Sequence, residues 1–150
     1  MHIKFILPRF HTNMFYPTKI LIKNKFKISI DCAYRQKNEN YSVVKSEIIE
    51  ESLLTKFLKK NLSKNLNKMN KFYLPKISTY LRHFKRNLPD IVIIRPYNLF
   101  FFILIFIITK YYKKKLIIYN QIQLKNINFS KKILYWIFTN LKKIKIISPL

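Results

Sequence analysis

Hydrophobic and polar residues follow two different periods in the first half of this chain, and each period predicts a different element. Residues 25–31 alternate polar and apolar side chains, which is the pattern of a strand with one buried face. In residues 43–60 the apolar side chains recur every three or four positions, and Ser42 stands where a helix N-cap is expected. The first strand is therefore predicted at 25–31 and the first helix at 43–60.

The second half of the chain is dominated by one apolar run. The thirteen residues 97–109 are almost wholly apolar, and a run of lysines and tyrosines at 110–115 ends them abruptly. A membrane-spanning helix needs about 20 apolar residues, so this shorter run favours a buried strand. The segment 91–94 is also strand-like, and residues 95–97 separate the two strands. We therefore predict a long β-hairpin at about 72–121 with its tip at 95–97.

Helical spacing returns after Ser130 in residues 131–143, and a short strand pattern follows at 142–147. The resulting order is strand, helix, strand, strand, helix, strand, which is the split β-α-β plan of ferredoxin-like α+β folds. Residues 1–24 precede this order and contain no acidic residue, so they are predicted to form a basic N-terminal extension that becomes ordered on RNA. Residues 25–150 are then one ferredoxin-like domain with two helices and an extended central β-hairpin.

Composition narrows the class of partner. The chain has 150 residues, and its 30 Lys and Arg against 6 Asp and Glu give a formal net charge of +24. Such a charge predicts a polyanionic partner, and its spread along the whole chain favours nucleic acid over an anionic membrane face. Lys, Asn, Ile, Phe and Tyr dominate the composition, and because their codons are rich in A and T we expect an organellar gene.

The chain contains no glycine, whereas average usage is about 7%. This absence excludes a phosphate-binding P-loop, a glycine-rich dinucleotide turn and a nucleophile elbow, since each needs Gly where the backbone approaches a ligand or takes positive φ. Left-handed turn positions are expected to fall to Asn instead. The single Cys32 allows no internal disulfide, and we interpret it as a buried thiol.

Acid–base and metal chemistry have little support in the sequence. Four of the six acidic residues lie in or just before the first predicted helix, where they complement the helix dipole and form a solvated face. The three histidines, His2, His11 and His83, lack metal-ligand spacing. We therefore expect no metal, no cofactor, no small-molecule substrate and no catalytic residue, and the chain is predicted not to be an enzyme.

Basic and aromatic residues are interleaved on both sides of the predicted hairpin tip. Guanidinium and ammonium groups bind phosphates, and aromatic rings stack on unpaired bases. The predicted RNA contacts are Lys76, Arg82, Lys85, Arg86, Arg95, Tyr97, Lys110, Tyr111, Tyr112, Lys113, Lys114 and Lys115.

This arrangement resembles the small-subunit ribosomal protein S-ten family, whose two central strands extend as a long hairpin into ribosomal RNA. Residues 25–60 resemble the family's first strand and helix, and Leu74-Pro75 resembles the Leu-Pro near the start of its second strand. The other matching segments are the strand and tip at 91–97, the basic run at 109–115, and the closing helix and strand at 130–147.

The resemblance implies a structural constituent of an organellar, mitochondrial ribosome, located in the head of the small subunit. Its partners would be small-subunit rRNA and neighbouring head proteins, in the mitochondrial matrix. The alternative is a small organellar membrane protein, such as an accessory subunit of a respiratory complex, with residues 97–112 inserted. A maturase-like nucleic-acid enzyme is a third hypothesis, which no pair of carboxylates supports.

Overall fold

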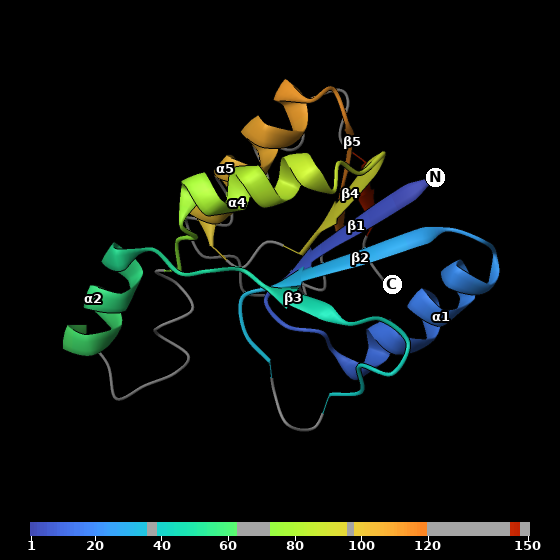
Figure 1. Ribbon diagram of the computed structural model, residues 1–150, viewed down its shortest axis with the longest axis horizontal. Coiled ribbons are helices and arrows are strands. Elements are labelled where there is room, and N and C mark those ends of the chain that lie inside the picture. The colour runs from blue at the N-terminus through green and yellow to red at the C-terminus, as the bar shows by residue number, and fades with distance from the viewer. Residues whose placement is uncertain (36–38, 63–72, 96–97, 120–144, 148–150) are drawn as a thin grey trace.

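Six parallel strands form one sheet at the centre of the molecule (Figure 1). The computed structural model describes residues 1–35, 39–62, 73–95, 98–119 and 145–147. In chain order the elements are β1 (His2–Leu7), the 3₁₀ turn η1 (Thr12–Met14), α1 (Phe15–Lys23), β2 (Lys27–Cys32), β3 (Ser46–Ile48), α2 (Leu53–Leu62), α4 (Ile77–Arg86), β4 (Ile91–Ile94), α5 (Leu99–Tyr111), β5 (Lys115–Tyr119) and β6 (Lys145–Ile147).

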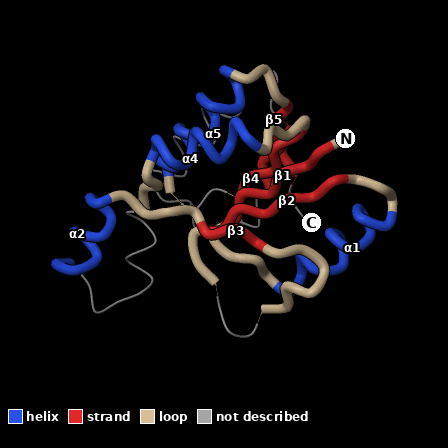
Figure 2. Tube along the Cα trace, viewed as in Figure 1, coloured by secondary structure: helices blue, strands red, loops and turns tan. Residues whose placement is uncertain are grey.

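The strand order across the sheet is β3-β2-β1-β4-β5-β6, and every neighbouring pair is parallel. The chain starts at the centre, builds outward to β3, returns to the other side of β1 as β4, and builds outward again to β6. Figure 2 shows α4 and α5 on one face of the sheet and α1 on the other. An open parallel sheet with this order and helices on both faces is the doubly wound α/β arrangement.

The central position of β1 follows from its composition. All six of its residues are buried, as a parallel strand with both faces covered requires. Ile3 and Phe5 point into the apolar cluster beneath α1, whereas Ile6 points into the cluster beneath α4 and α5. Lys4 is the one charged residue of the strand, and it too is fully buried. Residues 1–24 therefore contain β1 and α1, and the predicted basic extension is wrong for this segment.

The predicted combination of helices with one β-sheet is confirmed, but the ferredoxin-like topology is not, because its central strands would pair as an antiparallel hairpin. Residues 99–111 form α5 instead of the returning strand, and this helix connects the parallel strands β4 and β5. A parallel pair cannot be joined by a tight turn, so it requires such a crossover. The run was ambiguous in the sequence because it is apolar all round and lacks either period.

The segment before β4 also differs from the prediction. It was expected to be the second strand of the sheet, but residues 77–86 form α4. Tyr80 and Phe84 lie one turn apart and are buried on the face that meets the sheet. Pro75 and Pro89 lie outside the helix at its two ends, where their missing N–H groups break no helical hydrogen bond.

Other element predictions are confirmed within the described residues. β2 and β4 lie in the two segments with strand patterns, and β6 lies in the predicted last strand. The predicted helix at 43–60 is confirmed from Leu53 onward, whereas its beginning contains β3. The helix predicted at 131–143 lies outside the described residues.

Two lysines, rather than asparagines, take the left-handed conformation in the described part of the chain. Lys25 follows α1 with φ of 62° and Lys113 follows α5 with φ of 53°. Both positions end a helix before a strand, where Gly is the usual residue. In a chain without Gly, lysine takes these positions at a conformational cost.

No helix within the described residues has both the length and the apolar character needed to cross a membrane.

Candidate functional site

The predicted RNA contacts are divided between the two ends of the sheet. Because α4 and α5 run opposite to the strands, their C-termini lie beside the amino ends of β4 and β5. Lys76 and Arg95 lie at the carboxyl end, and Arg82 lies exposed on α4. Tyr97 lies outside the described residues. The remaining contacts, which are Lys85, Arg86, Lys110, Tyr111, Tyr112, Lys113, Lys114 and Lys115, lie at or near the amino end.

The basic residues at the amino end form what we call the amino-edge cluster. Phe84 of α4 stacks on Tyr112 after α5, with ring centroids 5.9 Å apart, which brings the two helix ends together. Tyr112 is half-buried and packs against the core, whereas Tyr111 is exposed. The members of the cluster are Lys85, Arg86, Lys110, Lys113, Lys114 and Lys115, all exposed except the half-buried Lys114.

Asp90 is the acidic residue that faces this cluster from the loop before β4. Its carboxylate lies 4.0 Å from Lys114 Nζ. It also accepts a hydrogen bond of 2.7 Å from the backbone N–H of His2, and this bond, followed by the charge of Lys114, lowers the pKa of Asp90 below its ordinary 3.8. The carboxylate thus ties the start of β1 to the start of β4.

A second group of charged side chains lies at the carboxyl end of the two central strands. Arg9 follows β1, and its Nη2 lies 2.7 Å from Nε2 of His11. Arg95 follows β4 directly, and its backbone N–H donates to Ile6 O of β1 at 3.0 Å. The carboxylate of Glu39 lies 3.7 Å from Arg9 Nη1. We call Arg9, His11, Glu39 and Arg95 the carboxyl-edge cluster.

The electrostatics of the carboxyl-edge cluster are set by its two arginines. Burial lowers the pKa of His11 below its ordinary 6.5, and the positive charges of Arg9 and then Arg95 lower it further, against the opposing effect of Glu39. The imidazole is therefore held neutral first by burial and further by its positive neighbours. An arriving anion would meet two permanent cations, the Glu39 carboxylate that lies beside Arg9, and one group ready to accept a proton.

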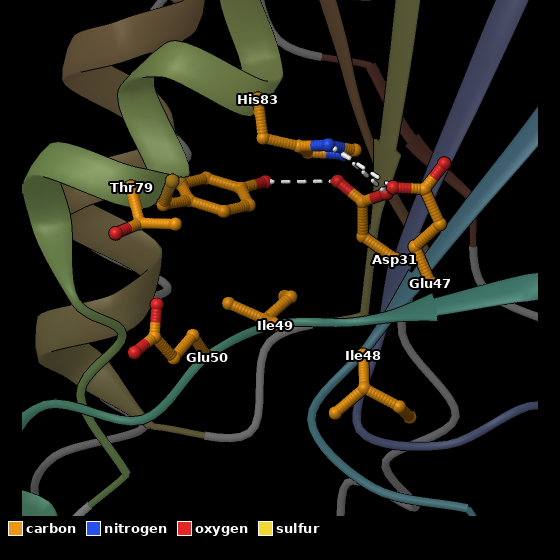
Figure 3. Close-up of a pocket in the computed structure, with 8 residues that line it drawn as sticks. Asp31, Glu47, Ile48, Ile49, Glu50, Thr79 and His83 are labelled. Carbon is orange, nitrogen blue, oxygen red and sulfur yellow. Dashed lines mark hydrogen bonds and ion pairs between the residues drawn. The ribbon is translucent and has the colours of Figure 1, made fainter.

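A cavity of about 120 Å³ lies on the α4 side of the sheet, where β2 and β3 meet the helix. Figure 3 shows the ring of His83 pointing from α4 toward the carboxyl groups of Asp31 and Glu47. Nε2 of His83 lies 3.2 Å from Asp31 Oδ1, and Nδ1 lies 3.1 Å from Glu47 Oε2. Lys4 Nζ approaches Asp31 Oδ2 and His83 Nε2, each at 3.2 Å.

The charged groups of Lys4, Asp31 and His83 contact one another. Besides Lys4 and His83, Asp31 accepts a hydrogen bond of 3.4 Å from the hydroxyl of Tyr80, whose pKa is raised by burial and by the carboxylate. Both ring nitrogens of His83 face partners, which leaves neither for a substrate. We interpret the group as an anchor that fixes α4 on β1 and β2.

The structure also bears on the reactivity of the Cys32 thiol and on the capacity to bind a metal ion. Cys32 is buried, as predicted, and burial raises the pKa of its thiol to about 12, so it is protonated at neutral pH. A protonated thiol is a poor nucleophile. Within the described residues, no group of three His, Cys, Asp or Glu side chains is placed to hold a metal ion.

The sequence reasoning missed Arg9 and His11, because they belonged to a segment interpreted as an extension. The signal that could have found them is the six-residue run 2–7, which ends at Pro8 and precedes a helical pattern. That is the start of a β-α-β unit, and the residues after its first strand are where such units bind ligands.

No family model, curated protein or solved structure matches this chain.

Proposed function

We propose that this protein binds a small phosphate-bearing ligand at the carboxyl end of its sheet. In open parallel sheets, ligands bind outside the carboxyl ends of the strands at the point where the strand order reverses. Here the order reverses between β1 and β4. Arg95 directly follows β4 and Arg9 lies two residues after the end of β1, and their position at the reversal point is the observation that carries the proposal.

Side chains would have to supply the recognition in this case. The glycine-rich turn that brings backbone N–H groups onto a phosphate cannot form in a chain without Gly. Arginine compensates for that loss, because its planar guanidinium donates two parallel hydrogen bonds to a phosphate. Neutral His11 adds a third group, which gains a proton when negative charge arrives.

The proposal is tested by calorimetric titration of the purified chain with ADP and with pyrophosphate. We expect Arg95→Gln to weaken binding by about tenfold or more, since a hydrogen bond to a charged group contributes about 1.5–3 kcal/mol and 1.4 kcal/mol is a factor of ten. Arg82→Gln is the matched control, because Arg82 is exposed on α4 and outside the cluster. The proposal fails if neither ligand binds saturably, or if both variants weaken binding equally.

RNA binding at the amino-edge cluster is the second candidate function. It is favoured by the net charge of +24 and by the packing of Phe84 on Tyr112, which gathers the basic ends of two helices. Neutralising phosphates with such a cluster releases counterions, so the affinity would fall steeply with salt. The ribosomal resemblance depended on a long hairpin, and α5 takes the place of its returning strand. An organellar ribosomal small subunit is therefore the proposed assembly only for this second candidate function.

Two measurements test the second candidate. In filter binding over a salt series, Lys110→Gln with Lys113→Gln should reduce the slope of log affinity against log salt by about 2, since each phosphate contact contributes about one. Lys19→Gln with Lys23→Gln on α1 is the matched control. In gradients of organelle lysate, the protein should co-sediment with the small ribosomal subunit and leave that position after ribonuclease treatment. A sedimentation position that does not change after ribonuclease treatment would exclude this function.

A further inference from the structure

The outer face of α5 is apolar where a solvent-facing helix is normally polar. Four residues at spacings of three, four and four make up this face, which we call the α5 stripe: Phe100, Ile103, Ile107 and Tyr111, with exposed fractions of 65%, 37%, 57% and 78%. The opposite face of the same helix, including Phe101 and Ile105, is already buried against the sheet. Burial in the fold therefore does not account for the stripe, and an exposed apolar row of this kind marks an interaction surface.

Positive charge adjoins one end of the stripe. Lys110 lies on α5 itself, and Lys113 and Lys115 follow its last turn, all exposed. The end of α4, held beside α5 by the contact between Phe84 and Tyr112, adds Lys85 and Arg86. Neither α4 nor α5 contains an acidic residue. The surface thus combines an uncovered apolar row with a basic margin.

We propose that the α5 stripe docks on an anionic lipid surface. Its aliphatic and aromatic side chains would enter the boundary between headgroups and acyl chains, while the amino-edge cluster binds the headgroup phosphates. Tyr111 is the last residue of the stripe and lies beside the lysines, at the level where amphipathic rings favour the membrane interface. α5 would lie in the plane of the interface, in agreement with its being too short to span.

Charge and side-chain type favour lipid over other occupants. A second copy of the chain would bring another +24 against this surface, and the two would repel. RNA would satisfy the lysines, but Ile103 and Ile107 would have no apolar partner among its phosphates and sugars. A lipid surface satisfies both parts. This proposal is independent of the carboxyl-edge ligand, since it uses none of those residues.

The test is co-sedimentation of the full chain with vesicles of phosphatidylcholine alone and with an equimolar mixture of phosphatidylcholine and phosphatidylglycerol. We expect binding to the mixed vesicles only, weakened about tenfold or more in Ile103→Gln with Ile107→Gln. Ile20→Gln on α1 is the matched control, because Ile20 is 59% exposed on the other face of the sheet. It should bind as the native chain does.

A second measurement reports how deeply the α5 stripe enters the membrane, instead of how tightly the protein binds to the vesicles. An environment-sensitive fluorophore on Ile107→Cys should shift to the blue on mixed vesicles, and the same label on Ile20→Cys should not. The native thiol does not interfere, because Cys32 is buried and has a pKa of about 12. Melting curves of each variant show that the substitutions leave the fold intact.

Three results would overturn the proposal. The first is native-like vesicle binding by the Ile103 and Ile107 variant, together with an unshifted label at residue 107. The second is self-association of the chain that this variant abolishes, which would make a second copy the occupant. The third is binding of RNA that depends on the two isoleucines while vesicle binding does not.

Discussion

At the scale of single residues, Lys4 shows why charge misled the interpretation of the first segment. A lysine in a short run suggests a solvated arm, yet Lys4 is fully buried at the centre of the sheet. The Asp31 carboxylate one strand away compensates its charge at 3.2 Å, and its ammonium also lies 5.4 Å from the ring centre of Phe84. Removing either member of such a buried pair costs about 3–5 kcal/mol. The pairing is invisible in the sequence, because 27 positions separate the two residues.

His11 provides a prediction on pH. Its pKa lies below the ordinary 6.5 in the free protein, chiefly because of burial and then because of Arg9. A bound phosphate would raise this pKa, so affinity should increase as pH falls through the pKa of the complex and level off below that of the free protein. One pKa unit corresponds to about tenfold in affinity. Calorimetry in buffers of different ionisation enthalpy should detect proton uptake, and His11→Gln should abolish both effects.

The same group has the opposite effect on stability without ligand. Because its folded pKa is lowered, the unfolded chain takes up the proton more readily, and the stability linked to His11 is lost as pH falls below 6.5. His11→Gln should therefore unfold with a flatter dependence on pH in that window. A ligand affinity of the native chain that does not change with pH would contradict the placement of His11 at the site.

At the scale of elements, the N-cap residue before α5 indicates a helix more clearly than the composition of α5 does. Asn98 takes an extended conformation, and its Oδ1 accepts a hydrogen bond of 2.7 Å from the N–H of Phe101, which is a side-chain N-cap. Its Nδ2 donates to Tyr73 O at 2.7 Å, so the cap is also fixed to the chain before α4. A strand has no need of such a cap, and the residue was therefore an unused signal for a helix.

Substitutions at Asn98 separate these two roles. Asn98→Ala should lower the free energy of unfolding by about 1–2 kcal/mol, because it removes the cap and the bond to Tyr73. Asn98→Asp keeps an acceptor for Phe101 and adds a negative charge favoured at a helix N-terminus, so its loss should be smaller. Urea unfolding followed by circular dichroism measures both. Equal losses in the two variants would mean that the bond to Tyr73 accounts for the effect.

At the scale of the whole molecule, the charge of +24 opposes the fold that the sheet stabilises. Mutual repulsion of 30 basic residues destabilises a compact state, and salt screens it over a Debye length of about 10 Å at 0.1 M. The structure relieves repulsion by pairing acids with lysines at the points where elements meet, as Asp31, Glu50 and Asp90 do. Most of the described basic residues nevertheless remain exposed.

The melting temperature should therefore rise with ionic strength. We expect an increase of several degrees between very low salt and about 0.2 M sodium chloride, because screening reduces the repulsion. Phosphate at equal ionic strength should raise it further in the native chain, but not in Arg95→Gln, because only the native site binds the anion. A melting temperature that is constant or falls with salt would show that repulsion does not limit stability.

The sequence by itself determined the properties that depend on local pattern and on counts. The strands β2, β4 and β6 were predictable, because β2 and β6 lie in segments with the alternation of a strand and β4 is a short apolar run. The absence of Gly excluded glycine-dependent phosphate sites, and the charge indicated anionic partners.

The tertiary structure decided which strands are neighbours and which ends meet. Helix and strand are indistinguishable by period in a run that is apolar all round, so α5 was settled by the capping of Asn98 and by packing on the sheet. Arg9 and Arg95 both act on His11 because β1 pairs in parallel with β4, and this pairing joins residues 88 positions apart. Local pattern contains no information on such pairing, because it is fixed by the burial of two faces at once.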